Sequence, residues 1–237
     1  MSVVLAGIVT SSIERKFLPN DSQTPVSSFR LSFIVSTGKD TTRNAEIMVQ
    51  AYGKAADFDF TQGAAVIVEG ILLVNKVTTS TGNRNIYSID ARRFHAGVEG
   101  LTLNSVVLVG RLGSDPEVKY FESGTVKADF SIASNRTKQI TDWYSIGLWG
   151  KAAEVAANYV RKGGQVGING SLTCEWWNDK DGNGERSKFL IRGERMTLLG
   201  NKRDEESNSR TASDSRVPVG AGVVVGDKWR NDDEIAF

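Results

Sequence analysis

The sequence has very few of the residues on which cross-links, metal sites and hydrolytic catalysis depend. Its single cysteine, Cys174, excludes an internal disulfide. Its single histidine, His95, argues against a zinc cluster and against a Ser-His-Asp triad. Long hydrophobic runs are missing too: the longest stretch without a charge, residues 1–13, is well short of the roughly 20 apolar residues of a membrane helix. We therefore expect a cytoplasmic protein that is not an enzyme and holds no cofactor or metal.

An excess of one charge is also missing. The 29 basic residues nearly balance the 28 acidic ones, which excludes a polybasic tail as the main binding device. The two signs are unevenly distributed, because acidic residues outnumber basic ones only in residues 201–237. A weakly cationic body with an acidic end hints at an anionic ligand and a separate partner site; chance is the alternative explanation.

The chain repeats itself once, at a spacing of about 100 residues. Four blocks recur in constant order: 2–7 as 105–110, 52–56 as 149–153, 62–70 as 162–170, and 87–94 as 189–196. We therefore divide the chain into a first unit (residues 1–100) and a second unit (residues 101–200). Residues 201–237 are polar and lack periodicity, which is typical of a disordered linker and tail.

Both units are predicted to consist mostly of strands. Alternating or continuous apolar patterns in the second unit predict strands over 105–112, 126–134, 142–149, 165–177 and 187–199. The period changes to that of a helix over 151–162, where Gly163 ends it. The order β-β-β-α-β-β is that of a five-stranded barrel of the oligonucleotide-binding (OB) type. The first unit follows the same order, with a short helix around residues 54–58, so the predicted fold is all-β: two tandem OB barrels, each with one short helix, plus the tail.

Alternation indicates which side chains of the second unit face solvent. In 142–149 one face carries Tyr144, Ile146 and Leu148, which suits a core. The opposite face carries Trp143 and Trp149, separated by small residues, and therefore forms a flat aromatic platform. The alternative is that these tryptophans belong to the core or to a subunit interface.

A third tryptophan, Trp177, ends the polar face of the strand at 165–177. Exposed aromatics on a barrel bind single strands of nucleic acid without reading sequence, because every base has a π-face. Nearby cations are candidates for neutralising phosphates: Arg111, Arg136, Lys138, Lys151, Lys162, Arg186 and Lys188.

The second unit resembles bacterial single-stranded DNA-binding proteins. Residues 104–120 are similar to the opening of that family, 141–163 to its middle, and 165–172 with Trp177 to its fourth strand. The resemblance implies tight, sequence-tolerant binding of single-stranded DNA in replication, repair and recombination, with no enzymatic step and at the bacterial nucleoid. It also implies that bases stack on Trp143, Trp149 and Trp177.

The last six residues resemble the acidic-hydrophobic tip of the same family, although Ala236 replaces its usual proline. The resemblance implies that replication and repair proteins bind this tip, which consists of Asp232, Asp233, Glu234, Ile235, Ala236 and Phe237. The further stacking aromatic that family members often carry shortly after the second strand falls near Lys138 here. Most members have one barrel per chain and form tetramers, so we expect this two-barrel chain to form a homodimer with four barrels. A protein-binding scaffold and an RNA chaperone are the alternative functions.

The first unit is not expected to bind DNA equally well. At the positions of the three tryptophans it has Glu46, Tyr52 and Val77, so that only Tyr52 offers a ring to a base. Its outward strand positions are apolar instead, which indicates protein contact: Ile67, Ile71 and Leu73.

Overall fold

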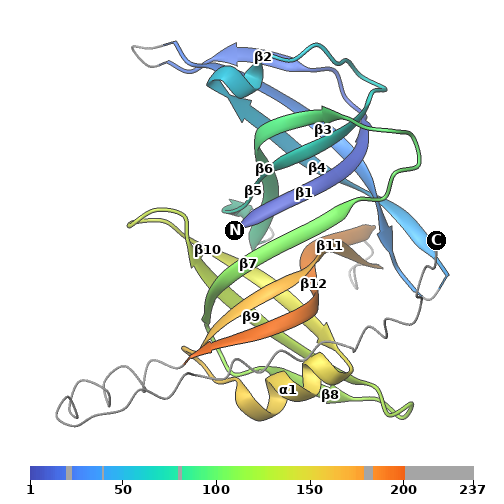
Figure 1. Cartoon of the computed structure of the whole chain (residues 1–237), viewed down its shortest axis with the longest axis vertical. Helices are drawn as coiled ribbons and strands as arrows, with labels where there is room; N and C mark the ends of the chain where they lie inside the picture. Colours follow the sequence, from blue (N-terminus) through green and yellow to red (C-terminus); the bar gives the residue numbers. More distant parts are fainter. Residues whose placement is uncertain (20–22, 39, 80–81, 179–183, 201–237) are drawn as a thin grey trace, which may run out of the picture.

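The computed structural model describes residues 1–19, 23–38, 40–79, 82–178 and 184–200. Twelve strands form one continuous sheet that coils into two barrels, shown one above the other in Figure 1. Unit 1 contains β1 (Ser2–Val9), β2 (Glu14–Phe17), β3 (Pro25–Ser36), β4 (Thr42–Tyr52), β5 (Ala65–Thr79) and β6 (Gly82–Ala96). Unit 2 contains β7 (Asn104–Leu112), β8 (Glu117–Tyr120), β9 (Val126–Asn135), β10 (Thr141–Trp149), β11 (Gln165–Asn178) and β12 (Glu185–Gly200).

Both barrels close in the same way. In unit 1, β1 pairs with β3 and β5, and β4 runs parallel to β6. In unit 2, β7 pairs with β9 and β11, and β10 runs parallel to β12. The predicted all-β fold with two OB barrels is confirmed. Two four-residue strands at the edges of the sheet, β2 and β8, have no counterpart among the strands predicted from the sequence.

The first strands of the two units join the barrels. β1 and β7 pair antiparallel, with Val3 opposite Val106 and Val4 opposite Ser105, and they lie side by side in the middle of Figure 1. Because this pairing continues the sheet from one barrel into the other, the two units are held in a fixed relation by backbone hydrogen bonds.

The period-two pattern of β10 separates core from surface as predicted. Tyr144, Ile146 and Leu148 are buried within unit 2. The helix α1 (Lys151–Tyr159) closes the lower end of this barrel in Figure 1. It ends three residues before the predicted Lys162, because Val160 takes an extended conformation and inserts its side chain into the core.

Unit 1 has no corresponding α-helix in the described part of the chain. The expected helix around 54–58 is a 3-10 turn, η1 (Gly53–Ala56). An aromatic cluster covers this end of the barrel instead, and the rings of Phe58 and Phe60 stack with their centroids 4.0 Å apart. Both rings pack against Phe29 and Phe94. Residues 57–60 therefore place two half-buried rings on the barrel instead of continuing a helix.

None of the described helices is long and apolar enough to cross a membrane. No group of three or more His, Cys, Asp or Glu side chains in the described ranges is arranged to hold a metal ion.

Candidate nucleic-acid interface

Three tryptophans stand on the surface of unit 2, as the alternation predicts. Trp143 and Trp149 on β10 are 46% and 41% exposed, and Trp177 on β11 is 45% exposed. Gly147 lies between the two rings of β10 on the same face of the strand. Gly147 is buried, and side-chain atoms of Asp129, Leu190 and Lys127 lie within 4 Å of its Cβ position.

The Trp143 ring lies over a glycine of the neighbouring loop. A Cβ atom at Gly113 would come within 2.3 Å of the Trp143 ring, so only glycine leaves room for this ring position. Arg111 and Trp143 both lie opposite Ala133 on β9. Since directly opposed residues share a face of the sheet, Arg111 belongs to the Trp143 side, where its guanidinium donates to the Gly163 carbonyl oxygen at 3.2 Å.

Trp149 is supported by two residues that sequence analysis did not select. The Phe121 ring stacks on it with centroids 5.8 Å apart. The Lys127 ammonium lies 5.3 Å from the Trp149 ring centroid, as a cation–π contact. Lys127 is directly opposite Trp149 in the β9–β10 ladder, so a correct strand register would have revealed it. Phe121 lies outside the strands, and no strand pattern marks it.

Trp177 shares its face of the β11–β12 hairpin with two predicted cations. Arg186 lies opposite Trp177, and Lys188 lies opposite Glu175 two residues before it. Lys188 is exposed, while Arg186 is half-buried. This hairpin therefore combines an exposed ring with basic side chains, which is the combination that a stacked base and its phosphate require.

The remaining predicted cations are distributed around unit 2. Lys138 is exposed between β9 and β10. Lys151 begins α1, where its ammonium lies 2.9 Å from the Glu154 carboxylate. Lys162 is exposed in the turn after α1, and its backbone N–H donates to Asp115.

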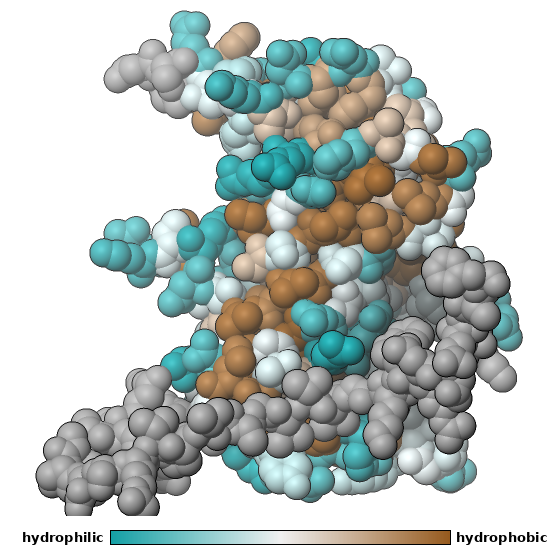
Figure 2. Space-filling model, in the orientation of Figure 1, coloured by the Kyte–Doolittle hydropathy of each residue, from teal (hydrophilic) through white to brown (hydrophobic). Residues whose placement is uncertain are grey.

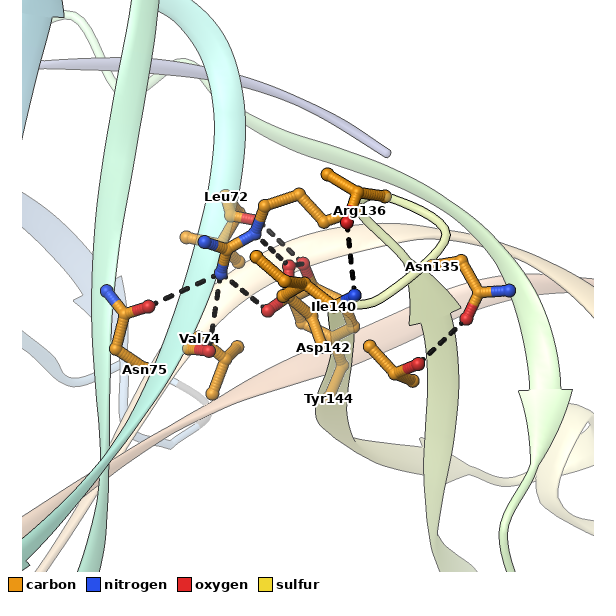
Figure 3. A network of polar contacts seen from close by, with 10 residues as sticks. Leu72, Val74, Asn75, Asn135, Arg136, Ile140, Asp142 and Tyr144 are labelled. Carbon is orange, nitrogen blue, oxygen red and sulfur yellow. Dashed lines mark hydrogen bonds and ion pairs between the residues drawn. The ribbon is translucent and has the colours of Figure 1, made fainter.

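Arg136 is placed differently from the phosphate contact that we predicted. Its guanidinium donates to both carboxylate oxygens of Asp142, at 2.9 and 2.6 Å. It also lies 3.4 Å from the Val74 carbonyl oxygen and from the Asn75 side chain, both on β5 of unit 1 (Figure 3). Asp142 is only 3% exposed, so Arg136 compensates a buried charge. The geometry therefore places Arg136 in the contact between the units.

Tyr144 extends this contact into the core of the molecule. Its hydroxyl donates to the Leu72 carbonyl oxygen of unit 1 at 2.6 Å and lies 3.3 Å from Asp142. Burial, together with the nearby Asp142 carboxylate, raises the pKa of Tyr144 far above its ordinary value. The phenol therefore stays protonated as a hydrogen-bond donor.

The equivalent surface of unit 1 lacks such a platform. Tyr52 is exposed, and its hydroxyl lies 3.3 Å from the Gln50 side chain. Glu46 is exposed and lies 4.0 Å from Arg30, while Val77 is exposed and apolar. The half-buried side chains of Ile67, Ile71 and Leu73 are more accessible than those of the core.

The double barrel with exposed rings on one unit defines a class of proteins, those that bind single-stranded nucleic acids by stacking. Residues 103–199 match the model of the single-strand binding protein family. A relative from Synechocystis named single-stranded DNA-binding protein 1 is 49% identical over 108 residues, covering 44% of this chain and 89% of the relative. The single-stranded DNA-binding protein of Thermosynechococcus vestitus is 50% identical over 109 residues, covering 45% and 91%. This chain belongs to the single-strand binding protein family.

Solved structures extend the similarity to both barrels. The wild-type single-stranded DNA binding protein from Thermus aquaticus aligns with a TM-score of 0.66, covering 93% of this chain and 96% of that chain at 19% identity. A deletion mutant of the same protein aligns with a TM-score of 0.67 over 85% of this chain. At this identity the comparison establishes the two-barrel fold alone.

Proposed function

We propose that this protein binds single-stranded DNA without sequence preference, through the surface of unit 2 that carries Trp143, Trp149 and Trp177. The observation that carries the proposal is the exposure of all three rings on the unit that matches the family. Each stacked base contributes about 1–3 kcal/mol of binding free energy, and the basic residues nearby offset phosphate charge. Protection of single strands during replication, recombination and repair at the nucleoid follows from such binding.

Single tryptophan replacements test the proposal. Trp143→Ala, Trp149→Ala and Trp177→Ala should each weaken binding to oligo(dT) by about 1–3 kcal/mol and reduce the quenching of tryptophan fluorescence. Phe17→Ala is the matched control, because Phe17 is a highly exposed ring on β2 of unit 1. Unchanged affinity in all three tryptophan variants would refute the platform. Equal affinity for oligo(dT) and oligo(rU) would instead favour a general RNA and DNA binder.

A second surface supports the proposed homodimer. Val107 and Val109 on β7 and Leu199 on β12 are large apolar side chains exposed to solvent. Figure 2 shows apolar side chains gathered over β1 and β7, in the middle of the molecule. Contiguous exposed apolar surface of this kind typically marks a protein contact, and we propose that a second copy covers it, which gives four barrels per dimer.

Light scattering tests the dimer. The wild-type protein should have the mass of two chains, and Val107→Asp with Val109→Asp should reduce the mass to that of one. Val98→Asp is the control, since Val98 is more exposed than either residue but lies in the loop after β6. A monomeric wild-type protein, or equal effects of the control and the double variant, would contradict the proposed interface.

The predicted partner-binding tip, residues 232–237, lies outside the described residues. We propose from its sequence that it binds other proteins rather than DNA. Asp232, Asp233 and Glu234 are repelled by phosphate, whereas Ile235 and Phe237 provide an apolar anchor next to an acidic segment. A small apolar pocket surrounded by Lys and Arg is the matching surface on a partner.

A further inference from the structure

A cleft of about 800 Å³ lies between the two units, next to Trp149. Unit 2 provides Gly147, Trp149, Trp176 and Arg192 among its lining residues. Sites for small organic ligands typically measure about 300–1,000 Å³, so the cleft has room for nucleotide-sized groups. Gly147 lines this space, and a Cβ atom there would lie 3.3 Å from both Leu190 and the Asp129 carboxylate.

The opposite wall comes from unit 1. Ser36, Thr37 and Gly38 at the end of β3, together with Arg43 on β4, line the cleft. Arg43 fixes this wall against unit 2, since its guanidinium lies 4.4 Å from the Trp176 ring centroid and forms a two-bond ion pair with the Glu185 carboxylate. The β3–β4 hairpin is therefore held next to the platform of unit 2.

Arg192 is the lining cation that can meet an anionic strand. Arg43 and Arg192 line the cleft, but the charge of Arg43 is already paired with Glu185. Glu175 is the carboxylate among the described lining residues. Lys127 lies 3.0 Å from Asp129 and 3.6 Å from Glu175, so two carboxylates share its charge. Arg192 is exposed and makes no ion pair with any residue that the structure describes, so its guanidinium is available to a phosphate.

Trp149 connects the cleft to the proposed binding surface. The same ring is exposed on the platform and lines the cleft. A base stacked on Trp149 therefore leaves its neighbours in the strand at the entrance to the cleft. We propose that the cleft holds the nucleotides next to the base on Trp149, so that the β3–β4 hairpin of unit 1 forms part of the DNA site of unit 2. This inference rests on the proposed function.

A pair of charge substitutions in unit 1 tests the inference in the full-length protein. Thr37→Lys and Thr37→Glu remove the same hydrogen bonds from the Thr37 hydroxyl to the backbone and side-chain oxygens of Thr41, at 3.3 and 3.1 Å. The two variants therefore differ mainly in the sign of the charge that they place at the cleft. We expect Thr37→Lys to bind oligo(dT) more tightly than the wild type, and Thr37→Glu to bind it more weakly.

Salt titrations and a second site complete the test. Because one phosphate contact changes the slope of log affinity against log salt by about one unit, Thr37→Lys should steepen this slope and Arg192→Gln should flatten it. Thr61→Lys and Thr61→Glu are the matched controls, since Thr61 is an exposed threonine of unit 1 that does not line the cleft. They should change affinity much less.

The possible results separate the two proposals. A wild-type protein that fails to bind oligo(dT) would overturn the proposed function and, with it, this inference. Normal wild-type binding with equal effects of the Thr37 and Thr61 pairs would overturn the cleft alone. The cleft proposal is also overturned if both Thr37 variants change affinity in the same direction, because that result indicates a structural effect of losing the hydroxyl.

Discussion

Replacing Arg136 by methionine should strongly lower the free energy of unfolding. It should leave unchanged the number of phosphate contacts that the protein makes with DNA. The substitution keeps a long side chain but removes both hydrogen bonds to Asp142, at 2.9 and 2.6 Å. The Asp142 carboxylate would then be buried without its cationic partner. Burying an unpaired charge is costly because the interior solvates it much less well than water does.

The size of the effect follows from the burial of the two partners. Removing one partner of a fully buried ion pair costs about 3–5 kcal/mol. Asp142 is 3% exposed but the Arg136 side chain is 24% exposed, so water reaches part of the pair and we expect the lower end, about 3 kcal/mol. At about 2–4 °C per kcal/mol for a chain of this size, the melting temperature should fall by about 6–12 °C.

Thermal unfolding followed by circular dichroism measures this change. Adding Asp142→Asn to Arg136→Met removes the unpaired charge, so the double variant should recover part of the lost stability. Oligo(dT) titrations at several salt concentrations examine the phosphate contact that the sequence predicted. If Arg136 contacts phosphate, its loss flattens the salt slope by about one unit. A flattened slope with unchanged stability would therefore refute the role in the unit interface.

Three further predictions concern other parts of the chain. Tyr52→Ala should weaken oligo(dT) binding much less than Trp149→Ala, because unit 1 lacks the other aromatic positions; equal losses would show that both units bind alike. Burial raises the pKa of the Cys174 thiol, so at a given pH less of it is thiolate and iodoacetamide should modify the folded protein slowly; modification as fast in the native as in the urea-unfolded protein would contradict this. Deleting residues 232–237 should leave DNA affinity unchanged or slightly higher at low salt and abolish the capture of partner proteins from DNA-free extract; recovery of the same partners would exclude the docking role.

The parts of the site that could be predicted from the sequence are those fixed by local geometry. The exposure of Trp143 and Trp149 follows from the period of two in a strand, which needs no knowledge of the partner strands. Trp177 follows from the same rule on β11. The end of the helix at Tyr159 could not be predicted, because Val160 leaves the helix to fill the core. The position of that core depends on contacts between elements that are distant in the sequence.

Contacts between strands and between units could not be predicted from local sequence patterns. Lys127 meets Trp149 through the register of a hairpin, which the sequence does not specify directly. The nearness of Arg136 to the tryptophans in the chain predicts a phosphate contact, yet its contacts on unit 1 lie at Val74 and Asn75. Only the packing of the two units brings these residues together.

Unit 1 has few aromatic side chains for stacking. It nevertheless contacts strand β10 of unit 2 near both exposed tryptophans of that strand. Near Trp143, Leu72 accepts a hydrogen bond from Tyr144, and Tyr87 lies 3.5 Å from the Ser145 backbone nitrogen. Near Trp149, the β3–β4 hairpin closes the cleft and is fixed there by Arg43. A stacking platform loses affinity when its rings must be ordered upon binding. In the proposed binding mode, unit 1 aids binding by holding β10 in place, a contribution that its lack of tryptophans does not diminish.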